Sequence, residues 1–225
     1  PGQPLSARTF KKYIDYIKAY NHFKEIYLKN VKRIWSNVPI YHEIDSFFNY
    51  LYHEHNSTPS KIFQKEKYRS LDDKDRIKEL LKYHQQFSKW LKSNANKWES
   101  AGSRLKRIRT VQKLLSPKNI QKLTRSDIEA VISNIHSMNS LPLNRVVFLK
   151  VNNNSTKLII ESWNYLLHRN DLPIEIRMEF CNDKLLRFGK SAIQELISCY
   201  YPNKYPVINS NSNCGMKFYG YDITV

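Results

Sequence analysis

The chain has 225 residues, with 37 Lys and Arg against 20 Asp and Glu, so its formal net charge is +17. A hydrophobic content of 41% with 13% aromatic residues excludes the composition of a disordered chain and predicts a folded protein of one or two domains. The sequence contains only 5 glycines and has no GxxxxGK[ST] or GxGxxG motif, which argues against a P-loop or Rossmann site. The positive charge points to a polyanionic partner, either nucleic acid or an acidic membrane surface.

The cysteine and histidine patterns predict no metal site and no disulfide framework. Cys181, Cys199 and Cys214 form no CxxC motif and cannot all pair with one another, which favours a reducing, cytoplasmic location. His53 and His55 are two positions apart and would point to different sides of a helix, so they do not form a zinc site together. No run of 18 apolar residues occurs. We therefore expect neither a cofactor nor a membrane partner.

Apolar residues recur at helical spacing through the first hundred residues. One set covers residues 10–27, a second covers 40–51, and a polar stretch at 55–60 breaks the pattern. A third set covers residues 77–91 and follows an acidic first turn, which the helix dipole favours. These patterns predict three helices, the last of which ends between Asn94 and Gly102.

Residues 103–125 hold eight Lys or Arg and no acidic residue. Leu105, Ile108 and Leu115 can face a core, while Lys106, Arg109 and Lys113 share another face of the same helix at i, i+3, i+7 spacing. Pro117 interrupts that helix. An ordinary solvated helix mixes charges of both signs, so we expect this stretch to contact phosphates, with a merely solvated face as the alternative. The candidate contacts are Arg104, Lys106, Arg107, Arg109 and Lys113.

The rest of the chain also reads as mainly helical. Thr124 and Asp127 resemble a capping box that begins a helix through Ile135. Residues 146–149 are competent for β structure and predict a linker, a loop or a short strand, so we expect at most a short β element near 145–150. Helical periodicity then returns, with further helices at 158–166, 173–178 and 192–199.

The fold class expected from these elements is mainly α, a multi-helix bundle with a helix-hairpin-helix-like unit at its C-terminal end. We place a division near residue 100, between an N-terminal helical region (1–100) and a basic helical region (101–225). A single domain is the alternative.

The most specific feature of the sequence lies between Leu185 and Tyr221. It predicts a helix, a tight turn through Gly189 and a second helix that begins at Lys190 or Ser191. Glycine at such a turn can supply a left-handed or otherwise unusual backbone angle. The first amides of the second helix would form an anion site, to which Lys190 adds a positive charge. A phosphate group suits this site.

This stretch resembles the helix-hairpin-helix element of the DNA glycosylase superfamily. That element has a Gly-hydrophobic-Gly hairpin, followed further along the chain by a Pro-Val-Asp segment and a final glycine. Here Phe188-Gly189-Lys190-Ser191 takes the hairpin position, with Arg187 in place of the first glycine. Asn209 replaces the acidic residue with which glycosylases stabilise developing positive charge. Because an amide cannot supply that charge, the resemblance implies DNA binding without base excision.

A closer resemblance is to the Tyr-Pro-(Ile/Val)-x-Asn variant of this element, which here is Tyr205-Pro206-Val207-Ile208-Asn209. This variant is associated with the DNA-recognition domains of McrB-type modification-dependent restriction systems, in which a DNA-binding domain precedes a GTPase motor. The resemblance covers about residues 173–222. It implies a recognition domain cut from a longer polypeptide, with double-stranded DNA, a GTPase or ATPase motor in the same polypeptide and a nuclease subunit as partners.

The function expected from the sequence is therefore a non-catalytic DNA-binding module of a bacterial restriction or phage-defence protein. It would grip duplex phosphates and read a modified or flipped base. The remaining expected contacts are Arg187, Phe188, Gly189, Lys190, Ser191 and Asn209. One alternative is a DNA glycosylase or lyase with Lys184 or Lys190 as amine nucleophile. The others are an RNA-binding protein and a membrane-surface protein.

Overall fold

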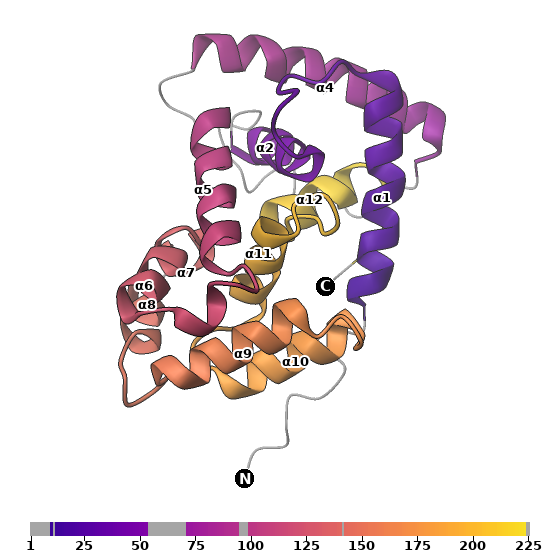
Figure 1. The fold of residues 1–225 in the computed structure, drawn as a ribbon. Coiled ribbons are helices and arrows are strands. Elements are labelled where there is room, and N and C mark those ends of the chain that lie inside the picture. Colours follow the sequence, from indigo (N-terminus) through magenta and orange to yellow (C-terminus); the bar gives the residue numbers. More distant parts are fainter. Residues whose placement is uncertain (1–9, 11, 54–70, 95–98, 141, 224–225) are drawn as a thin grey trace. The chain divides into compact units, whose positions relative to one another are not determined.

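The computed structural model describes residues 10, 12–53, 71–94, 99–140 and 142–223, and within these ranges it contains helices and no strand (Figure 1). The expectation of a mainly α fold is confirmed. None of the helices in these ranges is long and apolar enough to cross a bilayer. In chain order the helices are α1 (Tyr13–Asn30), α2 (Ile40–His53), α4 (Asp73–Ser93), α5 (Ala101–Leu114), the 3-10 helix η1 (Ile120–Lys122), α6 (Arg125–Ser133), α7 (His136–Asn139), α8 (Pro142–Phe148), α9 (Thr156–His168), α10 (Ile174–Lys184), α11 (Lys190–Tyr200) and α12 (Ser210–Phe218).

The chain forms two compact units. The N-terminal unit comprises Ile14–Arg104 with Tyr205–Val225, and the central unit comprises Leu105–Lys204 with Pro1–Tyr13. The chain passes from one unit to the other at the start of α1, within α5 and after α11. The division expected near residue 100 differs from this one at both ends of the chain, because Pro1–Tyr13 is grouped with the central unit and Tyr205–Val225 with the N-terminal unit. For the last segment the reason is packing, since α12 lies against α2.

Aromatic side chains form the core of the N-terminal unit. The ring centroid of Phe23 in α1 lies 5.2 Å from that of Phe48 in α2 and 4.8 Å from that of Tyr219. Phe47 joins α4 to this core through Phe87, at 5.6 Å. Pairs of this kind contribute energy beyond their buried area. Much of the aromatic content of the sequence therefore serves packing in this unit.

The core of the central unit is centred on Trp163 of α9. Phe148 at the end of α8 and Phe188 after α10 are both fully buried, and their ring centroids lie 6.3 and 5.7 Å from that of Trp163. The two phenylalanine rings also lie 5.2 Å apart. Phe188 therefore anchors the segment between α10 and α11 to this core.

The expectation of a linker, a loop or a short strand near 145–150 is wrong, because residues 142–148 form α8. Pro142 occupies the first helical position, where its fixed φ and missing N–H are tolerated. The helix places Phe148 against Trp163. This packing outweighs the preference of the adjacent valines for strands, since propensity is a weak determinant of structure.

Candidate nucleic-acid interface

The central-unit part of α5 carries a row of exposed cations. Lys106, Arg109 and Lys113 are exposed, whereas Ile108 is buried in the same helix. This is the arrangement that the spacing predicts. The structure gives none of the three side chains a hydrogen bond or ion pair within the described residues. We call these three residues the α5 row.

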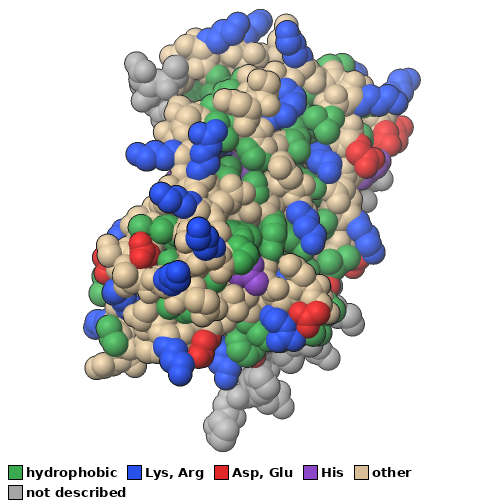
Figure 2. All heavy atoms as spheres, in the orientation of Figure 1, with side chains coloured by type: hydrophobic (Ala, Val, Ile, Leu, Met, Phe, Trp, Pro, Cys, Tyr) green, Lys and Arg blue, Asp and Glu red, His purple; other side chains and the backbone are tan. Residues whose placement is uncertain are grey.

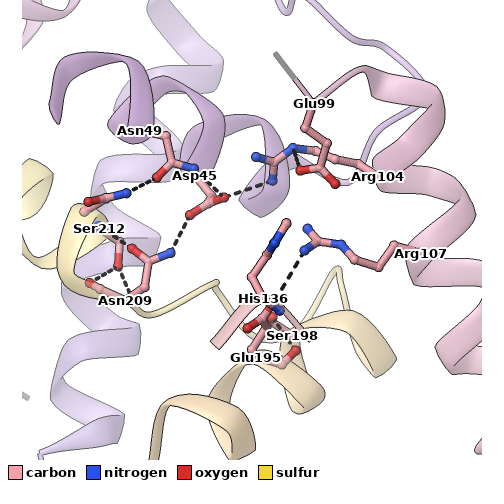
Figure 3. Close-up of polar contacts among 11 residues, drawn as sticks. Asp45, Asn49, Glu99, Arg104, Arg107, His136, Glu195, Ser198, Asn209 and Ser212 are labelled. Atoms are coloured by element: carbon pink, nitrogen blue, oxygen red, sulfur yellow. Dashed lines mark hydrogen bonds and ion pairs between the residues drawn. The ribbon is translucent and has the colours of Figure 1, made fainter. Parts of the chain in front are cut away.

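Arg104 lies at the start of α5 but in a different environment. It belongs to the N-terminal unit, and its side chain is 3% exposed. Its Nη1 lies 2.9 Å from Asp45 Oδ2 and its Nε lies 3.0 Å from Glu99 Oε2 (Figure 3). Two carboxylates neutralise this guanidinium and the protein covers it, so Arg104 is not available to a phosphate.

Arg107 is also held by a carboxylate, within the central unit. Its Nη1 lies 3.3 Å from Glu195 Oε1 of α11 (Figure 3). Glu195 accepts two further hydrogen bonds, from the backbone N of His136 at 2.7 Å and of Ser137 at 2.9 Å, at the start of α7. A buried carboxylate needs such donors to offset its lost hydration. Arg107 therefore stabilises the packing of α5, α7 and α11 and does not face an external phosphate.

The described arginines fall into two groups, those with a hydrogen bond or ion pair to another residue and those without one. Among the arginines that the structure describes, only Arg109 and Arg187 have no hydrogen bond or ion pair with another described residue, and both are exposed in the central unit. The other described arginines each have a polar partner: Arg33, Arg76, Arg104, Arg107, Arg125, Arg145, Arg169 and Arg177. A guanidinium left without an internal partner is suited to bidentate recognition of an external anion.

The hairpin between α10 and α11 has its unusual backbone angle at Arg187. Arg187 has φ of 62°, whereas Gly189 has φ of −84° and ψ of −169° at the N-cap of α11. Gly189 has an ordinary extended conformation, so the expectation that it supplies a left-handed or otherwise unusual angle is wrong. Arg187 is the residue that the predicted resemblance places at the first hairpin glycine. An L-residue in this region costs about 1 kcal/mol, so the surrounding structure must hold it there.

Asn154 holds the hairpin from one side. Its side chain is fully buried, and its Nδ2 donates to the carbonyl oxygens of Phe148 and Leu186, both at 3.0 Å. Its Oδ1 accepts from the Leu186 N at 2.9 Å. Leu186 and the buried Phe188 thus fix the chain on either side of Arg187, whose side chain is left exposed.

The N-terminus of α11 is open at Gly189. The residue is exposed, no side chain caps the helix, and a Cβ built on Gly189 would have no neighbour within 4 Å. The first amides of a helix lack intrahelical acceptors, so those of Lys190 and Ser191 can face an anion. Ser191 is exposed, and partial burial lowers the pKa of the Lys190 ammonium.

Asn209 has a local structural role in the N-terminal unit. Its Oδ1 accepts from Ser212 N at 2.8 Å, and its backbone N donates to Ser212 Oγ at 2.8 Å, so it caps α12. Its Nδ2 donates to Asp45 Oδ1 at 2.9 Å (Figure 3). The side-chain oxygen of Asn209 thus caps α12, and its side-chain nitrogen joins this cap to α2.

The two parts of the resemblance to the helix-hairpin-helix element fall in different units, with Arg187–Ser191 in the central unit and Tyr205–Asn209 in the N-terminal unit. Of the expected contacts, the α5 row, Arg187, Lys190 and Ser191 offer side chains at the surface, and Gly189 offers open backbone. Phe188 is a core residue.

No protein-family model, curated protein or solved structure matches the chain, so the resemblance stays a prediction.

Proposed function

We propose that the chain is a non-catalytic DNA-binding module whose central unit grips the phosphates of duplex DNA. The observation that carries this proposal is the presence of two exposed arginines that have no polar partner among the described residues, Arg109 in the acid-free α5 and Arg187 in the hairpin. The face of the molecule drawn in Figure 2 also shows many Lys and Arg side chains and few acidic ones. Phosphate contacts of this kind provide affinity and fix register, whereas base contacts provide specificity.

The spacing of the α5 row suits contacts with successive phosphates of one DNA strand. Lys106 and Lys113 are seven residues apart, which corresponds to about 10 Å along a helix axis at about 1.5 Å per residue. Phosphates on one DNA strand advance by about 3.4 Å along the duplex axis. The row can therefore contact several phosphates on one strand.

The hairpin adds a second kind of phosphate contact. Arg187 presents a guanidinium, and the open start of α11 presents backbone N–H groups and the positive end of the helix dipole. The left-handed angle at Arg187 is held by Asn154 and Phe188 at some conformational cost. Strained residues with exposed functional groups are found at binding sites more often than elsewhere. This hairpin is the part of the site that the resemblance to restriction-system recognition domains implies.

Substitution of the two unpaired arginines tests the proposal. We expect Arg109→Gln with Arg187→Gln to weaken binding of a fluorescent duplex in anisotropy titrations. The matched control is Lys157→Gln with Arg169→Gln, which removes the same charge from exposed central-unit residues that pair with Glu161 and Asp171. Equal affinity of the two variants for DNA would contradict the proposal.

A competition experiment tests the choice of partner. Unlabelled duplex DNA, duplex with methylated bases, single-stranded RNA and anionic lipid vesicles compete for the labelled complex. We expect duplex DNA to compete better than RNA or vesicles. A further advantage of the methylated duplex would support the modification-dependent recognition that the resemblance implies. Stronger competition by RNA or by vesicles would overturn the assignment to DNA.

Lyase chemistry at Lys190 is the second candidate function. The observation that favours it is the position of Lys190 at the uncapped start of α11, where partial burial also lowers the pKa of its amine and so favours the neutral, nucleophilic form. Such an amine can attack the aldehyde of an abasic site and form a Schiff base with loss of water. Borohydride reduction would then link the protein covalently to abasic DNA. Cross-linking that is lost in Lys190→Gln would replace the non-catalytic proposal with this one.

A further inference from the structure

The N-terminal unit contains an open cleft of about 800 Å³. Residues 30–34, at the end of α1 and directly after it, line one side, and residues of α4 between Leu81 and Lys92 line the other. Both helices are labelled in Figure 1. This volume lies within the range of about 300–1,000 Å³ that is typical of sites for small molecules.

The charged residues that line the cleft, among those the structure describes, are all basic. Lys32, Lys89 and Lys92 line it with exposed side chains that have no ion-pair partner among the described residues, and no acidic residue lines it. Arg33 also lines the cleft, but its Nε lies 3.2 Å from Glu43 Oε2. Lys89 and Lys92 are three positions apart on one helix, so their side chains share a face. The three lysines can therefore surround one anionic group.

A buried histidine lies at the same cleft. His84 lines it, is 8% exposed, and its Nε2 has no hydrogen-bond partner in the described structure. The imidazole packs edge-on against Tyr27, with ring centroids 5.3 Å apart. Burial lowers the pKa of His84, which favours the neutral ring. The neutral ring therefore forms part of the cleft wall, and a ligand bound in the cleft would change its surroundings.

The remaining lining combines apolar surface with neutral polar groups. Leu81 is 48% exposed although it is a large aliphatic residue, and Val31 and Ile34 line the cleft with it. Gln85 and Ser88 add hydrogen-bonding side chains on α4. The cleft therefore offers an anion site, an apolar wall and a few polar groups, which is the composition of a site for an anionic organic molecule.

We propose that this cleft binds a small organic phosphate of the nucleoside phosphate class. The phosphate lies among Lys32, Lys89 and Lys92, the base lies on the apolar wall at Leu81, and the ligand lies next to the ring of His84. This site belongs to the N-terminal unit and is independent of the DNA-binding proposal, which rests on the central unit.

Calorimetric titration of the full chain with ATP, AMP, adenosine and inorganic phosphate tests the site. We expect ATP and AMP to bind more tightly than phosphate or adenosine, because each of the latter fills only one part of the cleft. In Lys89→Gln with Lys92→Gln, ATP affinity should fall about tenfold or more. The matched control, Lys74→Gln with Lys78→Gln, removes the same charge from exposed positions of α4 that do not line the cleft.

Two further measurements separate this site from nonspecific charge effects. Addition of ATP should shift the NMR signals of the His84 ring, and substitution of the α5 row should leave ATP affinity unchanged. Equal ATP affinity in the two lysine variants, no shift at His84, or equal binding of ATP and inorganic phosphate would each overturn the proposal. None of these outcomes depends on DNA binding.

Discussion

Neutralisation of the α5 row is the most informative perturbation of the proposed interface. The change is Lys106→Gln, Arg109→Gln and Lys113→Gln in one chain. All three side chains are exposed and have no polar partner among the residues that the structure describes, so the substitutions should leave the fold intact. Glutamine keeps much of the length of these side chains and their helix propensity, while it removes the charge.

The expected effect is a change in the salt dependence of DNA affinity. Each neutralised phosphate contributes about 0.9 to the slope of log affinity against log salt, so loss of three contacts lowers the slope by about 2.7. Between about 50 and 200 mM salt, the affinity ratio between the wild-type chain and the variant should then shrink by about fortyfold.

The assay is fluorescence anisotropy with a labelled duplex over this range of salt. The control carries Lys29→Gln, Lys74→Gln and Lys78→Gln, three exposed lysines of the N-terminal unit with the same total charge. Circular dichroism and urea unfolding of both variants establish that the fold is retained. If the row variant and the control had the same slope, the affinity would depend on net charge alone, and the assignment to α5 would be refuted.

Four further predictions concern the fold and the hairpin. Asn154→Ala should lower the free energy of unfolding by about 2–3 kcal/mol in urea titrations, because the backbone of Leu186 loses both of its hydrogen bonds to that side chain. If the matched substitution of an exposed residue, Asn152→Ala, lowered the free energy of unfolding as much, this role of Asn154 would be contradicted. Gly215→Ala should destabilise the chain by about 1–3 kcal/mol because the new Cβ would overlap the ring of Phe48, whereas Gly102→Ala, with its nearest neighbour at 3.7 Å, should be neutral or stabilising by up to about 1 kcal/mol. The reverse order would be inconsistent with the packing of α12 on α2. Gly189→Asp should raise the melting temperature, since it supplies an N-cap to α11, and should weaken DNA binding because its carboxylate occupies the anion site. Unchanged DNA binding in this variant would show that the hairpin is not part of the interface. Hydrogen bonds from Thr124 lower the pKa of the Asp127 carboxyl, so the stabilisation from this cap is fully present above the pKa of the unfolded carboxyl and is lost as the pH falls through the folded pKa. An NMR titration should show a higher pKa for Asp127 in Thr124→Ala, and an unchanged pKa would contradict this cause.

Local patterns predicted much of the fold. Helical periodicity gave the mainly α class, and the spacing of Lys106, Arg109 and Lys113 indicated their shared exposed face. The capping box of Thr124 and Asp127 is present with both of its hydrogen bonds. These features depend on residues within one or two helical turns of each other, which sequence spacing describes well.

Features that depend on distant residues could not be predicted in this way. Arg104 pairs with Asp45 across 59 positions and Arg107 with Glu195 across 88, so a run of cations in the sequence does not show which members are buried. Asn154 contacts Leu186 across 32 positions, and its only local signal is a run of three asparagines that predicts a loop.

The hairpin shows the same limit at shorter range. Glycine is the residue expected at a left-handed angle, yet packing of Phe188 and the bonds of Asn154 place that angle at Arg187. Tertiary contacts thus decide which residue of a turn takes the strained conformation.

The salt dependence of duplex DNA binding by the unmodified chain tests the central claim most directly. With Lys106, Arg109, Lys113, Arg187 and Lys190 as phosphate contacts, the slope of log affinity against log salt should be about −4.5. Affinity should therefore fall about 500-fold between about 50 and 200 mM salt. Binding with no salt slope, or no binding at the lower salt concentration, would contradict the claim that this chain grips DNA through its phosphates.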